Sequence, residues 1–394
     1  MKKLLLIEDD QIFANIYRNK LVLDGFQVEI AYDGDTGFKL LHSFRPDAVI
    51  LDLILPKMSG VEIIRKLRAE PEFAQLPVIV FTNTYLTSIV QEAWKAGATK
   101  CLAKANCNPG QVISALRQIF SGKGGKGGKS GKGSAAEATA PIEEMPADAE
   151  TEFQTELRRS FVDNWPSTLA AIRGHLQSLT KAEDESARQL HLHELYRRVH
   201  QITGSAGITG MYPIAQLTDA FEALLRELHD NPDHVTVSTL RTVASAVDFL
   251  AALFQNGAMP GKRPPVAKVL VVEDEDIARR AILHALEKAR LKSVMVEDPV
   301  KALELVLDNK FDLVFLDVGL PNMNGFELCA KLRTLPAYKK TPVVFITSQN
   351  DFESRANSSI SGGSDFIAKP FIYVELAVKA LIYALRNREQ TTKA

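Results

Sequence analysis

One set of residues occurs twice in this 394-residue chain, at positions that differ throughout by 265. Its members are Glu8, Asp9, Asp52, Thr82 and Lys104 in the first copy, and Glu273, Asp274, Asp317, Thr347 and Lys369 in the second. Pro56, Gly60 and Pro77 correspond to Pro321, Gly325 and Pro342 under the same shift. Chance does not keep so many chemically distinct residues in register, so the chain contains a duplicated module.

Each copy alternates short apolar runs with amphipathic stretches. The runs are Lys3–Ile7, Phe26–Ala31, Ala48–Leu51, Val78–Phe81 and Thr99–Ala103, then Lys268–Val272, Val294–Val296, Leu313–Leu316, Val343–Ile346 and Asp365–Ala368. Five strands that alternate with helices predict a parallel sheet with helices on both faces. The runs before Asp52 and Asp317 are almost wholly apolar, which is typical of central strands buried on both faces.

The chain between the two copies has a different composition. Residues 121–149 begin as SGKGGKGGKSGKGS and predict a flexible linker with a root-mean-square span of about 30 Å. Residues 150–257 show the periodicity of long amphipathic helices, and a four-helix bundle is their natural packing. Breaks between helices are expected near Trp165–Pro166, Lys181–Ser186, Thr209–Pro213 and Asn231–Asp233. Residues 258–267 form a shorter, Pro-rich and stiffer linker, so the first module is residues 1–120 and the second is residues 268–388.

Composition excludes several classes of protein. The net charge of −1 gives no electrostatic reason to expect binding to nucleic acid or to an anionic membrane. Three cysteines argue against a disulfide framework and for a reducing cytoplasm. No run of about 18 apolar residues occurs, so no membrane span is expected. The apolar start of the chain is too short for a signal peptide.

The repeated residues follow the predicted strands at their carboxyl ends. In an open parallel sheet these ends form the ligand-binding edge where the strand order reverses. Three carboxylates at one edge repel one another unless a cation joins them, and oxygen ligands with open positions suit Mg²⁺. Thr82 can donate a hydrogen bond to a phosphoryl oxygen, and Lys104 can supply a point charge. Each edge therefore suits the transfer of a phosphoryl group onto a carboxylate.

Both modules resemble the receiver domains of two-component response regulators. The resemblance rests on LLLIEDD and VLVVEDE, VILDLILPKMSG and VFLDVGLPNMNG, VIVFTN and VVFITS, and CLAKA and FIAKPF. It implies a doubly wound, flavodoxin-like (βα)5 fold with Asp52 and Asp317 as phosphoacceptors. It also implies Mg²⁺ held by Glu8, Asp9 and Asp52 with the Ile54 carbonyl, and by Glu273, Asp274 and Asp317 with the Gly319 carbonyl. Thr82, Lys104, Thr347 and Lys369 would complete the two sites.

The two copies differ where receivers usually switch conformation. The second has Pro370 after its lysine, where the family places a cis peptide, together with Phe366 and Ser348. The first has Ala105, Cys101 and Asn83 at those positions. We expect the second module to be the conventional switch and the first mainly to handle phosphate.

His200 has the most informative context of the eight histidines. In a helix, Gly204 and Gly207 leave the face beside it almost bare, which would allow another protein to approach. The alternative is a helix that ends near Gly204, with His200 interacting with the helix dipole. The stretch HQITGSA resembles the motif of histidine phosphotransfer (HPt) domains, which implies that His200 is phosphorylated. Thr203 replaces the usual lysine, so Arg197 or the adjacent Arg198 is expected to supply the cation, and Arg197, which lies on the same helix face as His200, is favoured.

The remaining histidines of interest and the cysteines are not expected to bind a metal. His191 and His193 point to different helix faces, and no Cys or carboxylate set completes a tetrahedral site beside them. The cysteines are expected to be structural.

Together these features predict a phosphorelay protein that passes phosphate between Asp52, His200 and Asp317 in one direction or the other. GKGGKGG lacks P-loop spacing, so no kinase activity is expected and a sensor histidine kinase must supply phosphate. Other receiver or HPt proteins and a homodimer through a receiver are further expected partners. The stiff second linker would keep Asp317 from its own His200 and leave transfer between chains. The alternative is a phosphorylation-controlled scaffold, or the input half of a longer regulator whose output domain is absent.

Overall fold

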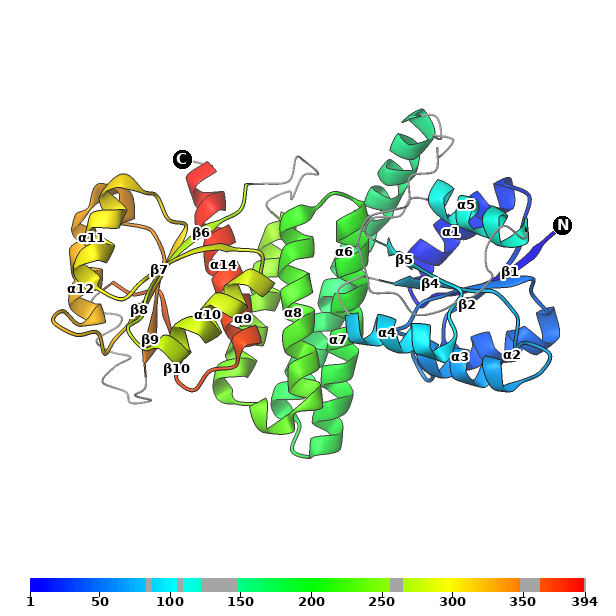
Figure 1. Cartoon of the computed structure of the whole chain (residues 1–394), viewed down its shortest axis with the longest axis horizontal. Coiled ribbons are helices and arrows are strands. Elements are labelled where there is room, and N and C mark those ends of the chain that lie inside the picture. The colour runs from blue at the N-terminus through cyan, green and yellow to red at the C-terminus, as the bar shows by residue number, and fades with distance from the viewer. Residues whose placement is uncertain (83–86, 105–108, 122–146, 256–264, 348–361, 393–394) are drawn as a thin grey trace, which may run out of the picture. The chain divides into compact units, whose positions relative to one another are not determined.

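The computed structural model describes residues 1–82, 87–104, 109–121, 147–255, 265–347 and 362–392 (Figure 1). Asn83, Ala105, Ser348 and most of both predicted linkers lie outside these ranges. The chain divides into two compact units. The first comprises Met1–Pro166 and Gly204–Thr209, and the second comprises Ser167–Thr203 and Gly210–Ala394.

The first module is a five-stranded parallel sheet of order β2-β1-β3-β4-β5. Its strands are β1 (Lys3–Ile7), β2 (Gln27–Ala31), β3 (Ala48–Leu51), β4 (Val78–Thr82) and β5 (Lys100–Ala103). Its helices are α1 (Gln11–Leu23), α2 (Gly34–Phe44), α3 (Gly60–Ala69), α4 (Thr87–Ala96) and α5 (Pro109–Phe120). All five predicted strands are confirmed to within two residues at each end. The order reverses between β1 and β3, as in doubly wound folds.

Two apolar layers enclose this sheet because the residues of β1 alternate between its faces. Leu4 and Leu6 face the side covered by α1 and α5, whereas Leu5 and Ile7 face the side covered by α2, α3 and α4. Figure 1 shows the helices distributed over both faces in this way. The continuous burial of β1, β3 and β4 explains why their sequences are almost uninterrupted apolar runs.

The second module repeats the fold with a sheet of order β10-β9-β8-β6-β7. Its strands are β6 (Lys268–Val272), β7 (Lys292–Val296), β8 (Leu313–Asp317), β9 (Val343–Thr347) and β10 (Asp365–Ala368). Its helices are α10 (Asp276–Lys288), α11 (Pro299–Asp308), α12 (Gly325–Thr334), η3 (Pro336–Tyr338) and α14 (Tyr373–Thr392). Helices α11 and α12 cover one face of the sheet, and α10 packs beside α14.

The region between the modules is helical, as predicted. It contains α6 (Ala147–Lys181), α7 (Glu185–Ile208), α8 (Tyr212–Asp230), the short η2 (Pro232–His234) and α9 (Val237–Gln255). The break predicted near Trp165–Pro166 is wrong, because α6 continues through Pro166. Proline removes only the hydrogen bond to the carbonyl of Val162, and Val162 is exposed, so water can satisfy that carbonyl.

Helix α9 is long and apolar enough to cross a membrane by length and composition alone. Half of its apolar window is buried inside the fold, however, as in the core helices of soluble proteins. The helix is therefore weak support for a membrane span, and its apolar character is explained by packing.

A glycine lies against the backbone at the end of the central strand in both modules. A Cβ atom on Gly60 would lie 2.2 Å from the carbonyl oxygen of Asp52, and one on Gly325 would lie 2.2 Å from that of Asp317. The loop after each strand folds back here, since Gly60 N donates to Leu53 O at 3.0 Å. Close approach, rather than a positive φ, therefore explains why both copies keep glycine at this position.

We predict that Gly60→Ala destabilises the first module by about 2–4 kcal/mol, because the backbone around Asp52 must shift. Gly174→Ala is the matched control, since nothing lies within 4 Å of its added Cβ in α6. That change is expected to stabilise its helix by about 0.5–1 kcal/mol. Denaturant unfolding of the full chain measures both, and equal small effects would contradict the close-approach explanation.

Candidate functional site

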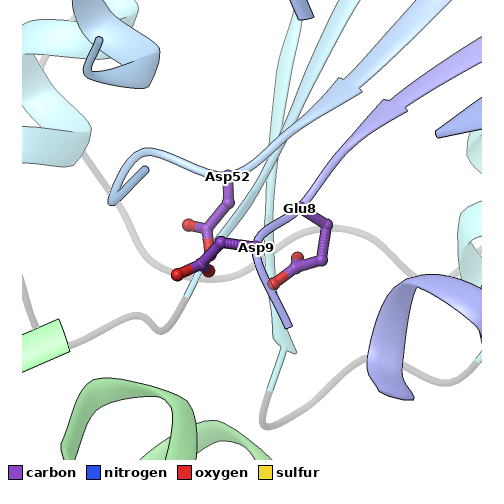
Figure 2. A group of neighbouring side chains, drawn as sticks. All are labelled: Glu8, Asp9 and Asp52. Atoms are coloured by element: carbon purple, nitrogen blue, oxygen red, sulfur yellow. The ribbon is translucent and has the colours of Figure 1, made fainter. Parts of the chain in front are cut away.

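The strand register brings the predicted acidic residues together at one edge of each sheet. Ile7 pairs with Leu51, so Glu8 and Asp52, the next residues, emerge side by side. Val272 pairs with Leu316 in the second module, which places Glu273 beside Asp317. In each module three carboxylates have oxygen atoms within 4.8 Å of one another: Glu8, Asp9 and Asp52, and Glu273, Asp274 and Asp317. Figure 2 shows the first three converging from the ends of β1 and β3.

A buried lysine closes the first acidic edge. Lys104 Nζ lies 2.7 Å from Glu8 Oε2 and 2.5 Å from Asp52 Oδ2, and all three side chains are almost fully buried. The ammonium also lies 5.0 Å from the centre of the Phe13 ring, which favours a cation–π interaction. Asp52 Oδ1 accepts the backbone N–H of Leu53 at 2.6 Å. Opposite charges and hydrogen bonds thus offset the cost of burying this set.

The second edge has the same residues in a looser arrangement. Lys369 Nζ lies 2.8 Å from Glu273 Oε1 but 3.5 Å from Asp317 Oδ1, and it also lies 3.5 Å from Glu275 Oε2. Asp274 is exposed, whereas its counterpart Asp9 is half-buried. The lysine of the second module therefore divides its charge among three acids and leaves the phosphoacceptor more accessible.

Burial and repulsion hold a proton more tightly on one carboxyl of each edge. Burial raises the pKa of Glu8 well above its usual range; Lys104 opposes this effect, and the charge of Asp52 adds to it. Burial likewise raises the pKa of Glu273, against the hydrogen bond from Lys369 and with the help of Asp317. In each edge three carboxylates face one lysine, and the repulsion from Asp52 or Asp317 that helps raise these pKa values would be relieved by a bound cation.

Two orphaned polar atoms show that the edges fit a cation and a phosphoryl group. Thr82 Oγ1 is buried at the end of β4 without a hydrogen-bond partner among the described residues. Glu273 Oε2 is equally buried and unpartnered within the described part of the chain. A hydroxyl donor and a carboxylate oxygen are the groups that a phosphoryl oxygen and Mg²⁺ would engage. Thr347 occupies the place of Thr82 at the end of β9 and is also buried.

The remaining predicted ligands lie beside these edges. Ile54 follows the phosphoacceptor by two residues, and its N–H donates to Asp52 Oδ1 at 3.4 Å. Gly319 lies in the matching turn, where an added Cβ would be 3.5 Å from Asp317 Oδ2. Whether their carbonyls bind a cation stays a prediction.

The switching positions of the second module are partly described. The Lys369–Pro370 peptide is cis, as the resemblance implied, and Phe366 packs against the apolar core of α11 and α12. Cys101 is half-buried at the Phe366 position of the first module, and burial raises the pKa of its thiol to about 11. A thiol of this kind is unreactive, in keeping with a structural role.

His200 is buried in α7 and has a partner that sequence reasoning missed. Its Nδ1 lies 2.9 Å from Oε1 of Glu222 in α8, and Glu222 is itself buried. The carboxylate accepts the Nδ1 proton and so fixes the ring's tautomer and orientation. Glu222 follows Phe221 on the apolar stripe of α8. An acid on an apolar stripe needs a buried polar partner, so this position in the sequence could have indicated the contact. The helix does not end at Gly204, because α7 extends to Ile208.

The cation expected beside His200 has a partner of its own. Arg197 Nη1 donates to Glu194 Oε1 at 2.9 Å, within α7 and one turn before His200. Thr203 Oγ1 donates to the carbonyl of Val199 at 2.9 Å, so this hydroxyl is engaged by its own helix. The assignment of Arg197 rather than Thr203 stays a prediction, and these contacts are compatible with it.

His191 and His193 each lie beside a different histidine. His191 Nδ1 lies 3.3 Å from Nδ1 of His175, whereas the His193 ring lies 5.5 Å from that of His229. The two acidic edges are the groups of three or more potential metal ligands that the described residues bring together.

Comparison with known proteins agrees with this geometry. The response regulator receiver domain family matches residues 4–117 and 269–380, and the Hpt domain family matches residues 156–255. The transcriptional regulatory protein SrrA of Staphylococcus aureus is 35% identical over 127 residues, which are 32% of this chain and 50% of that protein. The chain thus spans about half the length of the curated relatives it matches.

Two of the solved structures with likeness to the chain each cover 30% of it. The chemotaxis response regulator CheY4 of Vibrio cholerae is 30% identical, with coverage of 30% of this chain and 99% of that chain and a TM-score of 0.29. The receiver domain of a histidine kinase from Syntrophus aciditrophicus is 31% identical, with coverage of 30% and 90% and a TM-score of 0.28. Because two matched segments carry the acidic edges and the third carries His200, the chain belongs to the response regulator receiver family, with two receiver domains flanking an Hpt domain.

Proposed function

We propose that the chain is a phosphorelay intermediary in which Asp52, His200 and Asp317 carry the phosphoryl group. The observation that carries the proposal is the presence of two lysine-bridged acidic edges and a carboxylate-oriented histidine in one chain. The chain would receive phosphate from a sensor histidine kinase and exchange it with receiver or HPt partners. We place this activity in the cytoplasm.

The transfer step follows from the side chains in place. A carboxylate oxygen of Asp52 or Asp317 attacks phosphorus, the N–P bond of phosphorylated His200 breaks, and a new O–P bond forms. The departing electron pair stays on the imidazole nitrogen, while Glu222 keeps the proton on Nδ1. Lys104 or Lys369 then faces the acyl phosphate, and Thr82 or Thr347 donates to one of its oxygens.

Mg²⁺ would be held by the carboxylates of Glu8, Asp9 and Asp52, or of Glu273, Asp274 and Asp317. It would neutralise negative charge as the phosphoryl group nears the carboxylate. The orphaned oxygen of Glu273 supports this assignment most directly.

Within the first unit, one contact favours the first receiver as a partner of the phosphotransfer helix. Ser205 Oγ donates to Asp10 Oδ2 at 3.2 Å. Asp10 follows the acidic pair at the end of β1, and Ser205 lies five residues after His200 in α7. This contact supports recognition of this stretch of the helix by the rim of the first receiver.

Radiolabelled phosphotransfer tests the proposal. We expect label on His200 and on both aspartates after incubation with a sensor kinase, and the order in which Asp52→Ala, His200→Ala and Asp317→Ala abolish downstream label gives the route. Each substitution should reduce the label on residues that come later in the route by at least about 100-fold, because the nucleophile itself is lost. Label on Asp317 alone, with a phosphorylation-dependent dimer, would contradict the relay and favour a phosphorylation-controlled scaffold.

The pH dependence of Mg²⁺ binding tests the metal assignment. A cation needs its carboxylates deprotonated, so affinity is lost as the pH falls through a raised pKa. The pKa values of Glu8 and Glu273 are both raised, so both edges should lose affinity as the pH falls, by about tenfold per pH unit once the glutamate is protonated. Calorimetric titrations of Asp317→Asn and Asp52→Asn chains isolate the first and second edges. An affinity that does not fall with pH at either edge would contradict the assignment.

A further inference from the structure

Helix α14 of the second receiver is buried on every side, unlike its counterpart in the first. In α5 the buried residues Pro109, Val112, Ala115 and Leu116 form a single stripe. In α14 every residue of 374–382 is buried, including Glu375 and Lys379. A helix buried all round has a second partner besides its own sheet. That partner is the Hpt bundle, because α14 packs against α8 and α9 in the second unit (Figure 1).

Polar contacts fix this packing near the start of α14. Oε1 of Glu375 accepts hydrogen bonds from Ser238 Oγ at 2.7 Å and Thr242 Oγ1 at 2.9 Å, both in the first turns of α9. Farther along, the guanidinium of Arg386 lies 5.2 Å from the centre of the Phe249 ring. The two helices therefore run alongside each other in the same direction. A buried carboxylate with two hydroxyl donors specifies one register, since a shift would leave it unsatisfied.

The first half of α8 contacts the opposite end of the receiver. Gln216 Nε2 donates to the carbonyl of Ala289 at 2.9 Å, just after α10 ends. Asp219 lies close enough to Arg290 for the positive charge to lower its pKa, although burial and Glu222 raise it more. Helix α10 runs back from the acidic edge through 13 residues, which is about 20 Å. Ala289 and Arg290 thus lie at the edge of the sheet remote from Asp317.

The packing of α8 against the receiver determines how far His200 lies from Asp317 along the direction of the strands. Glu222, the partner of His200, lies six residues beyond Gln216, which is about 9 Å along α8 from the contact with the remote edge. Because α10 spans about 20 Å between the two edges, on the order of 10 Å along the strands still separates the level of His200 from that of Asp317. Phosphoryl transfer needs the reacting atoms about 3 Å apart, so this arrangement forbids direct transfer.

We propose that the contact of α14 with α8 and α9 is a fixed joint that holds the second receiver away from its own His200, so that Asp317 exchanges phosphate with His200 of a second copy of the chain. The inference rests on the proposed relay function. Transfer between chains is also expected from the sequence, because the second linker is short and stiff. Here its physical cause is the packing of the receiver on the bundle, not the reach of the linker.

The acidic edge of the docked receiver remains open to such a partner. Asp274 and Glu275 are exposed, and Ile277 beside them is 77% exposed. Three consecutive acids, Asp274, Glu275 and Asp276, are exposed just before and at the start of α10. Arg197 and Arg198 precede His200 on α7, so the incoming histidine brings positive charge to a negative edge.

Phosphotransfer in chains carrying Asp52→Ala, which silences the first receiver, tests the joint. His200 is loaded with labelled phosphoramidate in the presence of a chelator, the excess donor is removed, and Mg²⁺ starts transfer. We expect tenfold dilution to slow the appearance of label on Asp317 about tenfold. We also expect an added His200→Ala chain to capture label. A rate unchanged by dilution, or an acceptor chain that captures none, would overturn the proposal.

Substitutions of the residues that form the joint provide a second test. Glu375→Lys, or Ser238→Ala with Thr242→Val, should release the receiver and add a phase of transfer that dilution does not slow. Val237→Lys is the matched control, because Val237 precedes Ser238 but is 74% exposed, and it should leave the kinetics unchanged.

Hydrogen exchange separates failure of the joint from failure of the relay. The amides of α14 should be protected in the intact chain and lose protection in Glu375→Lys, whether or not phosphate is present. Unprotected α14 amides in the intact chain would overturn the joint. Absence of label on His200 with α14 protected would instead refute the relay and leave the joint standing.

Discussion

The ion pair between a buried lysine and the carboxylates at the end of the first and third strands is the interaction on which each receiver depends. Lys104 lies within 3 Å of both Glu8 and Asp52 at the first edge. Removal of one partner from such a set leaves a buried charge uncompensated, at a cost of about 3–5 kcal/mol. The same lysine must turn toward the acyl phosphate when Asp52 is modified. One interaction therefore couples the stability of the fold to its chemistry.

The duplicated edges differ in how firmly that lysine is held. Lys104 is almost fully buried between two acids, whereas the side chain of Lys369 is 16% exposed and divides its contacts among Glu273, Glu275 and Asp317. The first edge is a closed site whose occupancy should depend strongly on pH. The second is a looser site in a receiver whose α14 is already packed against the bundle. The two receivers thus share chemistry but differ in accessibility and in the surface they present.

The sequence predicted much of this because receiver chemistry lies at strand ends. A constant shift of 265 located both acidic edges, and apolar runs located all ten strands. Prediction failed where tertiary context decides. Pro166 continues α6 because the carbonyl it leaves unbonded is at an exposed residue, which no local pattern reveals. Glu222 was missed because its partner His200 is on another helix, and the burial of α14 depends on contacts with α8 and α9.

The nitrogen of His200 that carries phosphate tests the central claim most directly. Because Glu222 engages Nδ1, the phosphoryl group is assigned to Nε2. Phosphorus NMR of the phosphorylated chain, labelled with ¹⁵N at histidine, should show a phosphoramidate resonance coupled to Nε2. The resonance should be absent in His200→Ala, and Glu222→Gln should slow its formation while the fold is retained. A resonance coupled to Nδ1, or phosphate found on aspartate with none on His200, would contradict the account.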